Sequence, residues 1–347
     1  MYKDKILGCI LGGAVGDALG YPIEFNSYAE IISTFGKKGV NDYVYQKGLI
    51  SDDTQMTLFT IDGLLMENNG KYPFEEMKIY NDNIYMSYLE WLSTQMFPYS
   101  KRKDSEYYDE DSVLLNTEDL YDLRAPGNTC LSALRSGEIG TTNSPINNSK
   151  GCGGIMRVAP IGLFFKPKMY SSDFVALMGG SVAAITHGHP LGYIPSAVLS
   201  CMLNKIVYSN ISIRDALIES VNIVDKLYNC SNDMKYLKEL LNKTFKFTNN
   251  GKSDIENISE LSGNAYNGGG WVAEETLAIA LYCCLKYPND FEKAIVAAVN
   301  HDGDSDSTGA VAGNIMGAVL GYDKIPKKYI ENLEMNSLIE EMALKLI

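Results

Sequence analysis

Apolar residues recur three and four positions apart along most of this chain, the spacing that gathers them on one face of an α-helix. Segments that alternate with period two are few, and none is flanked by a good hairpin turn. The pattern predicts helices at 4–19, 53–69, 74–95, 171–186, 190–208, 212–228, 232–243, 271–286, 290–300, 306–320 and 335–346. We therefore expect an all-α fold, a single compact multi-helix domain that covers residues 1–347.

Two of the predicted helices carry glycine at every fourth position, so that the glycines share one face. They are Gly8, Gly12, Gly16 and Gly20 in the first helix, and Gly309, Gly313, Gly317 and Gly321 in the helix near the C-terminal end. Each glycine costs about 1 kcal/mol relative to alanine inside a helix. Close helix–helix approach would offset that cost, so we expect the two glycine faces to cross in the core.

Three segments lack helical periodicity, at 98–128, 137–154 and 262–270. The first is rich in charge, and the other two are rich in glycine, asparagine and serine, which favour loops and turns. Long loops in a helical body tend to carry function. We therefore expect part of a functional site in these segments.

The composition excludes some classes of partner. The formal net charge is −13 and the isoelectric point is about 4.8. A protein that binds nucleic acid independently of sequence needs a basic face. A protein that binds an anionic membrane surface needs one as well. We expect neither nucleic acid nor membrane as a partner.

The seven cysteines include no C-x-x-C motif, so neither a disulfide framework nor a zinc site is indicated. Reduced, buried thiols favour a cytoplasmic location. The first residues faintly resemble a lipoprotein signal ending at Cys9, but the apolar run before Cys9 is too short, and Asp17 interrupts the apolar run after it. We interpret this stretch as the first helix of a soluble protein, too short to span a bilayer.

Two acidic clusters stand just before apolar helical runs: "SDD" at 51–53 and "DGDSDS" at 302–307. If the two helix N-termini converge, one pocket holds the side chains of Ser51, Asp52, Asp53, Asp304, Asp306 and Ser307. Helix dipoles favour anions there, but four carboxylates still need protons or cations. Oxygen ligands suit Mg²⁺, Mn²⁺ or Ca²⁺, and so many acidic groups favour two ions.

Other known motifs fit the sequence of these two acidic clusters less well. An EF-hand loop that starts at Asp302 would need Gly at its sixth place and Glu at its twelfth, but Ser307 and Gly313 stand there. The D-x-D-x-T pattern of haloacid-dehalogenase-like phosphatases needs a preceding strand and a large α/β domain, which this helical pattern does not provide. Simple helix capping by serine and aspartate stays open as an alternative.

Cys152 in "GCGGIM" and His187 in "THGH" present a further alternative, a thiol nucleophile with its base. A lone cysteine in a glycine loop is more often structural. His187 is equally well interpreted as a packed core histidine or as a group that contacts substrate.

Taken together, six segments in order resemble the ADP-ribosylglycohydrolase family, typified by dinitrogenase reductase-activating glycohydrolase. They are "GCILGGAVGDALGYPIEF" (8–25), "SDDTQM" (51–56), "GCGGIMRVAPIGL" (151–163), "ITHGHP" (185–190), "GGGWVAEETLAIAL" (268–281) and "GDSDSTGAVAGNIMGAVLG" (303–321). The resemblance implies an all-α fold with a binuclear Mg²⁺ or Mn²⁺ centre in a cleft. It also implies hydrolysis of the glycosidic bond between ADP-ribose and an acceptor side chain.

The resemblance assigns roles to individual residues. The implied metal ligands are Ser51, Asp52, Asp53, Asp304, Asp306 and Ser307. The implied catalytic groups are Glu24, Asp53 and Asp304. The implied substrate-binding residues are Gly151, Cys152, Gly153, Gly154, Met156, Arg157 and His187, and the backbone N–H groups of 151–154 would cradle the pyrophosphate.

This chain departs from the family pattern at four positions. Serine replaces the more usual threonine at Ser51 and Ser307, which keeps the hydroxyl. Cys152 replaces the usual asparagine of the glycine loop, and Asp302 is an extra carboxylate without an assigned role.

The expected function is metal-dependent removal of ADP-ribose from a modified acceptor, most simply ADP-ribosyl-arginine on protein, with free ADP-ribose as product. Alternatives are ADP-ribosyl-serine, an ADP-ribosylated nucleobase, or a small ADP-ribose derivative as substrate. A further alternative is an inactive member of the family that only binds ADP-ribose. The sequence leaves the oligomeric state open.

Overall fold

The computed structural model describes residues 2–66, 76–228, 232–263 and 269–347. Its longer α-helices are α1 (Tyr2–Gly20), α3 (Asp52–Leu65), α4 (Glu76–Met96), α7 (Ser172–Ala184), α8 (Pro190–Ser209), α9 (Ile213–Leu227), α10 (Asn232–Phe247), α12 (Ala273–Lys286), α13 (Phe291–Val299), α14 (Ser305–Leu320) and α16 (Asn336–Leu344). The shorter α-helices are α2 (Tyr28–Phe35), α5 (Asn128–Arg135), α6 (Ala159–Phe164), α11 (Asp254–Leu261) and α15 (Lys327–Glu331). Short 3₁₀ turns are η1 (Tyr21–Ile23), η2 (Tyr99–Asp104), η3 (Glu118–Tyr121), η4 (Cys152–Arg157) and η5 (Tyr322–Lys324).

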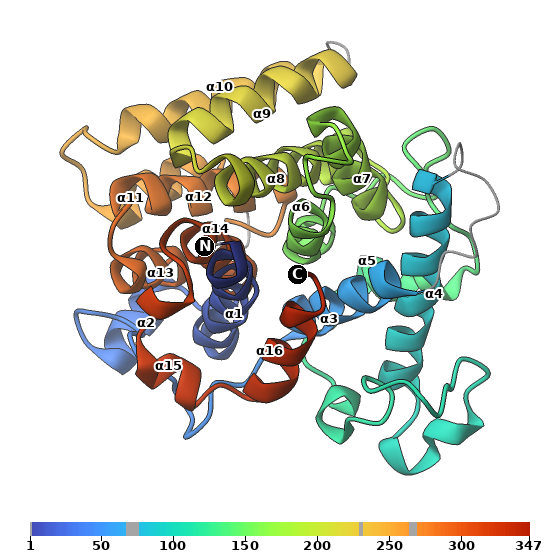
Figure 1. Cartoon of the computed structure of the whole chain (residues 1–347). Helices are drawn as coiled ribbons and strands as arrows, with labels where there is room; N and C mark the ends of the chain where they lie inside the picture. The colour runs from blue at the N-terminus through green and yellow to red at the C-terminus, as the bar shows by residue number, and fades with distance from the viewer. Residues whose placement is uncertain (1, 67–75, 229–231, 264–268) are drawn as a thin grey trace.

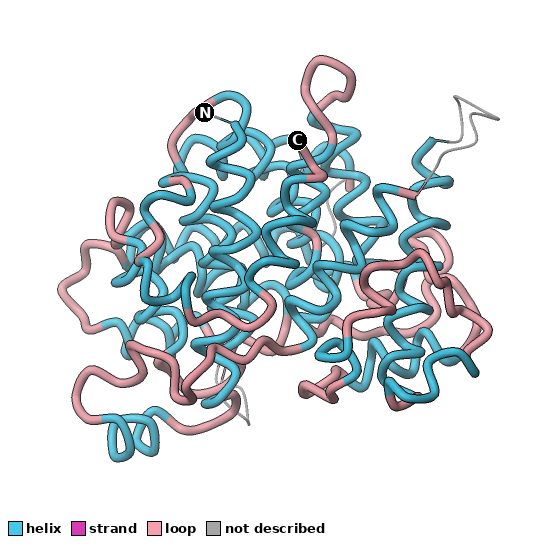
Figure 2. The backbone as a smooth tube through the Cα atoms, turned by 60° about the horizontal axis from the view of Figure 1, so that its bottom comes forward, coloured by secondary structure: helices cyan, strands magenta, loops and turns pink. Residues whose placement is uncertain are grey.

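The described residues contain no β-strand, only isolated bridges between single residues (Figures 1 and 2). The all-α prediction is confirmed. Each helix predicted from periodicity has its counterpart, although residues 67–69 and 74–75 of two predicted helices lie outside the described residues. So does most of the predicted loop at 262–270.

Helices α1 and α14 form the centre of the packing, with α1 in the middle of the fold in Figure 1. Their glycine faces meet so closely that no side chain fits between them. A β-carbon added at Gly16 would lie 1.9 Å from the carbonyl oxygen of Gly309, and one added at Gly313 would lie 1.9 Å from the oxygen of Gly12. The predicted crossing of the two glycine faces is confirmed.

The crossing determines where the functional site lies. The end of α1 at Gly20 rests against the start of α14 at Ser305, since a β-carbon on Gly20 would lie 2.2 Å from the Ser305 oxygen. The segment that comes after α1 therefore begins beside the N-terminus of α14. Phe25 in that segment donates its backbone N–H to the oxygen of Gly303 at 2.7 Å.

The first helix is more apolar than we expected from the sequence. The stretch Tyr2–Ile23 is long and apolar enough to cross a membrane by length and composition alone, so the expectation that it is too short was wrong. In this fold, 89% of its apolar window is buried against the rest of the protein. Burial at the centre of a helical core accounts for the same apolar character.

The five shorter helices were not predicted, because each offers too few turns for a clear period. Two of them nevertheless begin with a capping box. Ser27 and Glu30 exchange hydrogen bonds at the start of α2, and Ser253 and Glu256 do so at the start of α11. This signature is legible in a sequence.

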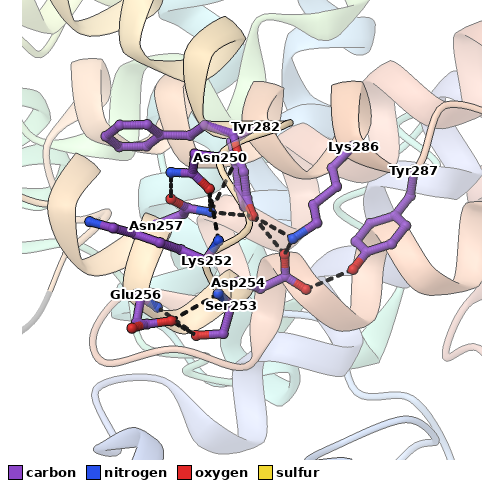
Figure 3. A network of polar contacts seen from close by, with 10 residues as sticks. Asn250, Lys252, Ser253, Asp254, Glu256, Asn257, Tyr282, Lys286 and Tyr287 are labelled. Atoms are coloured by element: carbon purple, nitrogen blue, oxygen red, sulfur yellow. Dashed lines mark hydrogen bonds and ion pairs between the residues drawn. The ribbon is translucent and has the colours of Figure 1, made fainter.

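A polar network holds α11 against α12 (Figure 3). The carboxylate of Asp254, in the first turn of α11, accepts hydrogen bonds from Tyr282 Oη at 2.7 Å and from Lys286 Nζ at 2.7 Å. Tyr287 Oη donates to its second oxygen at 2.8 Å. The network anchors α12, whose first turn begins two residues after Trp271.

A buried ion pair fixes the approach to α3. Arg124 in the predicted loop 98–128 places its guanidinium on Glu334, with contacts of 2.9 and 3.1 Å. The same carboxylate accepts the backbone N–H of Ile50 at 3.1 Å. The backbone oxygen of Arg124 accepts from Asp52 at 3.0 Å. The first turn of α3 is thus tied to a loop and to the C-terminal region.

The cysteines lie as expected where they are described. Cys9, Cys130, Cys201, Cys283 and Cys284 are buried free thiols, and Cys152 is partly exposed. Cys230 lies outside the described residues.

Candidate metal centre and cleft

Helices α3 and α14 both begin with a polar cap. Ser51 accepts the backbone N–H of Asp53 at 3.2 Å, and Asp304 accepts that of Ser307 at 3.1 Å. Capping therefore does explain Ser51 and Asp304, as the alternative interpretation proposed. It does not explain why Asp52, Asp53 and Asp306 are also almost completely buried.

The start of α14 converges with the segment after α1, and Asp52 and Asp53 of α3 line the same cleft. Carboxylate oxygens of Glu24, Asp304 and Asp306 lie within 4.8 Å of one another. Glu24 reaches this point because its segment is held on Gly303 by the backbone of the next residue, Phe25. Glu24 thus shares one small volume with Asp304 and Asp306, which lie about 280 residues later in the chain.

Burial and mutual repulsion disfavour the charged forms of these groups. Burial raises the pKa of Glu24 to about 8, and the charges of Asp304 and Asp52 add to the effect. Burial likewise raises the pKa of Asp52 to about 8. It also raises the pKa of Asp53 and of Asp306 well above the ordinary range. The ionised form of these carboxyl groups is therefore unfavourable unless a positive charge binds beside them.

The residues present fit a divalent cation of the hard type. The donors are carboxylate oxygens, the ligands that Mg²⁺, Mn²⁺ and Ca²⁺ prefer. No lysine or arginine is among the described residues that line the cleft. In addition, Oδ2 of Asp53 is buried without a hydrogen-bond partner within the described part of the chain. A bound cation would satisfy this oxygen and neutralise its neighbours.

Asp17 supports the cluster from behind and was missed as a functional residue. Its carboxylate, fully buried in α1, accepts the backbone N–H of Ser51 at 3.0 Å and of Thr54 at 3.2 Å. The Thr54 hydroxyl also donates to it. Burial raises the pKa of Asp17 to about 6, while these hydrogen bonds lower it. The signal was present in the sequence, because an aspartate in a glycine-faced apolar helix needs a partner.

The carboxylates form the floor of a cleft of about 650 Å³. The facing wall comes from three segments: residues 125–130, residues 149–156 with His187, and Trp271. Phe25 and Trp271 are 52% and 43% exposed and line the cavity. A cleft of this size, lined by both carboxylates and aromatic rings, suits a ligand of nucleotide size.

Most of the predicted site residues meet in this cleft. Its lining includes Glu24, Asp52, Asp53, Gly151, Cys152, Gly153, Met156, His187, Asp304, Asp306 and Ser307. Ser51, Gly154 and Arg157 do not line it. For these three the geometry does not support direct contact with a ligand in the cleft.

Arg157 instead lies in the core beneath the site. Its guanidinium donates to the Thr186 hydroxyl at 2.6 Å and stacks 4.2 Å from the ring centre of Tyr88. Thr186 in turn contacts Nδ1 of His187 at 2.9 Å. Burial, with a contribution from Arg157, lowers the pKa of His187 to about 3. His187 therefore presents a neutral imidazole to the cleft.

The predicted pyrophosphate cradle is only partly available. The backbone N–H of Cys152 donates to the oxygen of Trp271 at 2.9 Å, and that of Gly151 points to Ser149 Oγ at 3.4 Å. These two groups already have acceptors. They position the glycine loop against Trp271 and leave less of the loop for phosphate than predicted.

Comparison with known proteins decides the family. The sequence model of the family described as ADP-ribosylglycohydrolase matches residues 1–347. This chain belongs to the ADP-ribosylglycohydrolase family. Its members are hydrolases that act on glycosidic bonds of ADP-ribose.

Individual ADP-ribosylglycohydrolases match along most of the chain. An ADP-ribosyl-[dinitrogen reductase] glycohydrolase of Rhodospirillum rubrum is 24% identical over 96% of this chain and 91% of its own length. The ADP-ribosylarginine hydrolase Tri1 of Pseudomonas putida is 25% identical over 99% of this chain and 78% of its own. ADP-ribosylhydrolase ARH3 of Mus musculus is 25% identical over 54% of this chain and 53% of its own.

A solved structure shares the fold. A protein titled ADP-ribosylglycohydrolase-related protein complex superimposes with a TM-score of 0.60 and 22% identity, covering 99% of this chain and 97% of that one. The similarity is evidence for the fold alone.

Two departures of this ADP-ribosylglycohydrolase from its family pattern have structural consequences. The Cys152 thiol is not paired with His187 as its base, because it donates to Oδ2 of Asp304 at 3.2 Å instead. Burial raises the pKa of the thiol well above its usual range, which argues against a nucleophilic thiolate. Asp302 is not part of the carboxylate cluster, and its Oδ1 accepts the backbone N–H of Tyr28 at 2.8 Å, in the first turn of α2 beside the N-cap Ser27.

Proposed function

We propose that this enzyme removes ADP-ribose from ADP-ribosyl-arginine on protein, with two Mg²⁺ or Mn²⁺ ions in the acidic cluster. The observation that carries the proposal is the convergence of Glu24, Asp304 and Asp306 within 4.8 Å on the floor of a cleft of nucleotide size. Asp53, whose buried Oδ2 has no hydrogen-bond partner within the described part of the chain, would serve as a ligand of the second ion.

The acceptor is chosen on two grounds. A relative named for ADP-ribosylarginine matches over 99% of this chain, whereas the match to ARH3 covers 54%. The cleft also holds several carboxylates and, among its described lining residues, no lysine or arginine. An acidic cleft favours an acceptor that is a cation, and guanidinium remains charged at all physiological pH values.

The chain's own residues account for most of the chemistry. Cleavage of the bond between ribose C1 and the guanidino nitrogen builds positive charge on the sugar ring. The carboxylates of Asp53 and Asp304 stabilise that charge. Glu24 takes a proton from the attacking water as the water oxygen bonds to C1 and the C1–N bond breaks, and Glu24 then passes that proton to the departing guanidine nitrogen. Divalent ions, when bound, supply Lewis acidity and neutralise the cluster, which favours the ionised form of Glu24.

The opposite wall would bind the rest of the substrate. The neutral imidazole of His187 can hydrogen-bond without attracting a second anion. Phe25 and Trp271 offer exposed ring faces on which a base can stack. Because no cationic side chain is available among the described lining residues, the pyrophosphate would rely on backbone N–H groups and on the metal ions. We also propose a cytoplasmic location, in keeping with the reduced thiols.

The test is turnover of a panel of ADP-ribosylated acceptors, carrying the modification on arginine, serine, a nucleobase or a small molecule. Free ADP-ribose should form fastest from the arginine substrate, only with Mg²⁺ or Mn²⁺ present. Asp304→Asn should reduce kcat by about a thousandfold, a loss of about 4 kcal/mol in transition-state stabilisation. Full activity in a metal chelator would sink the proposal.

The panel also separates the alternatives. Preferential turnover of the serine, nucleobase or small-molecule substrate would move the activity elsewhere in the family. Tight binding of ADP-ribose by calorimetry with no turnover of any acceptor would instead indicate a binding protein.

A further inference from the structure

Lys150 lies in the middle of the wall opposite the carboxylates, yet it does not line the cleft. Its chain neighbours Ser149 and Gly151 both do. The side chain of Lys150 instead places Nζ on Oε1 of Glu274, in the first turn of α12. The charge of this lysine is therefore engaged behind the wall and is not offered to a ligand in the cleft.

Glu274 is the buried member of this ion pair. Its side chain is completely buried, whereas that of Lys150 is 39% exposed. Its second carboxylate oxygen, Oε2, is buried without a hydrogen-bond partner in the described part of the chain. Burial raises the pKa of Glu274, and the hydrogen bond from Lys150 lowers it. A buried carboxylate is tolerated only when it is paired, so the first turn of α12 depends on Lys150.

The same two segments carry Trp271. The backbone oxygen of Trp271 accepts the N–H of Cys152 at 2.9 Å, and the backbone oxygen of Lys150 accepts the N–H of Ala273 at 2.9 Å. Lys150 thus ties the glycine loop to the start of α12 twice, through its backbone oxygen and through its contact with Glu274. The exposed ring of Trp271 stands on a backbone that these contacts hold on both sides.

We propose that Lys150 and Glu274 are positioning residues, whose ion pair fixes Trp271 on the cleft wall and so sets the affinity for the ADP-ribose part of the substrate without touching it. The inference rests on the proposed stacking of the substrate base on Trp271 and not on the identity of the acceptor. The pair should act on ligand binding only through the ring, and it should leave metal binding unchanged.

A direct role of Lys150 in binding the pyrophosphate makes the opposite prediction for Glu274. If the lysine turned into the cleft to meet the anion, Glu274 would compete with the ligand, and removing its charge would tighten binding. If the pair positions Trp271, removing that charge weakens binding. The sign of the effect in Glu274→Gln therefore separates the two roles.

The experiment measures the Kd of ADP-ribose by calorimetry in saturating Mg²⁺. Lys150→Met removes the charge and keeps the length of the side chain, and it should raise the Kd by about fivefold. Glu274→Gln should raise it by about threefold. Lys150→Arg should restore the affinity to within about twofold, because a guanidinium also pairs with a carboxylate. The affinity for Mn²⁺ should be unchanged in all three variants.

A double-mutant cycle with Trp271→Ala shows whether the pair acts through the ring. In the Trp271→Ala background, Lys150→Met should change the Kd by less than about twofold. Acrylamide quenching of fluorescence gives a second reading without ligand, because Trp271 is 43% exposed and Trp91, the other tryptophan, is fully buried. Quenching should increase in Lys150→Met.

Lys205→Met is the matched control. Lys205 is also a lysine in an ion pair, with Glu219 at 2.8 Å, and neither residue lines the cleft. Its loss should leave the Kd of ADP-ribose and the quenching of Trp271 unchanged, whatever it costs in stability. Thermal unfolding shows that each variant folds. If Lys150→Met does not fold, Glu274→Gln enters the same cycle in its place.

Four results would overturn the inference. They are unchanged affinity in Lys150→Met, tighter binding in Glu274→Gln, additive effects of Lys150→Met and Trp271→Ala, and an equal loss of affinity in Lys205→Met. None of these readouts needs hydrolysis, so turnover of another acceptor would leave the inference standing. Conversely, hydrolysis of ADP-ribosyl-arginine together with additive effects would leave the proposed function intact and remove this inference. Absence of ADP-ribose binding by the unmodified protein would remove both.

Discussion

The two sides of the cleft are held in place by different forces. The carboxylate side stands on the ends of α1, α3 and α14, where α1 and α14 touch backbone to backbone. The opposite wall consists of short segments joined by single contacts, such as the bridges of Gly151 with Val272 and of Gly269 with Gly303. At the crossing an added β-carbon would meet backbone atoms, whereas at Gly153 and Gly269 of the wall it would meet side chains, those of Cys130, His187 and Ser262.

This difference suggests how one fold can serve several acceptors. Metal ligands must stay within fractions of an ångström of their positions, and helices packed through glycine provide that rigidity. The wall touches the carboxylates at two points, through the thiol of Cys152 on Asp304 and the backbone N–H of Gly127 on Asp52, and its other side chains can change without altering these contacts. Its anchor is partly electrostatic, since Lys150 beside the glycine loop forms an ion pair with the buried Glu274 of α12.

The largest effect should come from filling the helix crossing. Gly313→Ala would place a β-carbon 1.9 Å from the Gly12 oxygen, so the helices must separate. We expect a loss of about 3 kcal/mol or more in the free energy of unfolding, at the upper end for overpacked sites. Urea denaturation measures it.

Gly36→Ala is the control for that variant. Gly36 has a φ of +81°, and no atom lies within 4 Å of an added β-carbon. Only backbone strain of about 1 to 3 kcal/mol is expected there, because φ +81° with ψ −177° is a region that essentially only glycine adopts. Equal losses in the two variants would show that the crossing is not unusually tight.

The next effect concerns pH and belongs to the carboxylate side. The pKa of Glu24 is about 8 in the fold against an ordinary value of 4.5. Below pH 4.5 both states hold the proton, and between those pH values only the folded state does, so stability falls as pH rises through this window. Relative to Glu24→Gln, the metal-free enzyme should therefore lose about 3 to 4 kcal/mol of stability between about pH 5 and pH 8.

With saturating Mg²⁺ or Mn²⁺, the stability relative to Glu24→Gln should instead rise with pH, because the ion binds the ionised carboxylate of Glu24. Thermal unfolding at several pH values, with and without metal, provides the measurement. A pH-independent difference between the two proteins would contradict the burial of Glu24 beside other carboxylates.

A smaller effect tests the opposite wall. Trp271→Ala removes a partly exposed ring and should raise KM by about tenfold, or about 1.4 kcal/mol, with a smaller change in kcat. Mn²⁺ binding should not change, since the carboxylates stand on other elements. Leu123→Ala, which removes a side chain 65% exposed and outside the cleft lining, is the control and should leave KM unaltered. A loss of metal binding in Trp271→Ala would show that the two sides are not independent.

The smallest effect separates Asp302 from its neighbours. Its carboxylate caps α2 and does not face the cluster, so Asp302→Ala should cost about 1 kcal/mol of stability. Metal affinity and turnover should stay within about twofold of the unmodified enzyme. A drop comparable to that of Asp304→Asn would place Asp302 among the ligands after all.

The carboxylate side could be predicted in large part because its signals are local. Glycine at every fourth position indicated the crossing, and runs of aspartate before apolar helices indicated the N-termini. The spacing of residues along the sequence could not predict that Glu24 lies next to Asp304 and Asp306. Only the family resemblance brought Glu24 into the site, since its approach depends on the backbone contact of Phe25 with Gly303.

The opposite wall was harder to predict for physical reasons. An exposed aromatic such as Trp271 looks like any surface residue until the chain folds around it. Arg157 belongs to a substrate-loop motif, yet the 3₁₀ turn in which it sits directs it into the core. In a single turn, tertiary contacts decide which way a side chain points. A segment that short has no hydrophobic periodicity from which the direction could be predicted.

The most direct test of the central claim is the stoichiometry of Mn²⁺ binding to the metal-free protein, measured by titration with electron paramagnetic resonance. The convergence of carboxylates from α3, α14 and the segment after α1 predicts two Mn²⁺ per chain, with at least one lost in Asp304→Asn and none lost in Asp302→Asn. Absence of Mn²⁺ binding by the unmodified chain, or equal binding by the Asp304→Asn protein, would contradict the account.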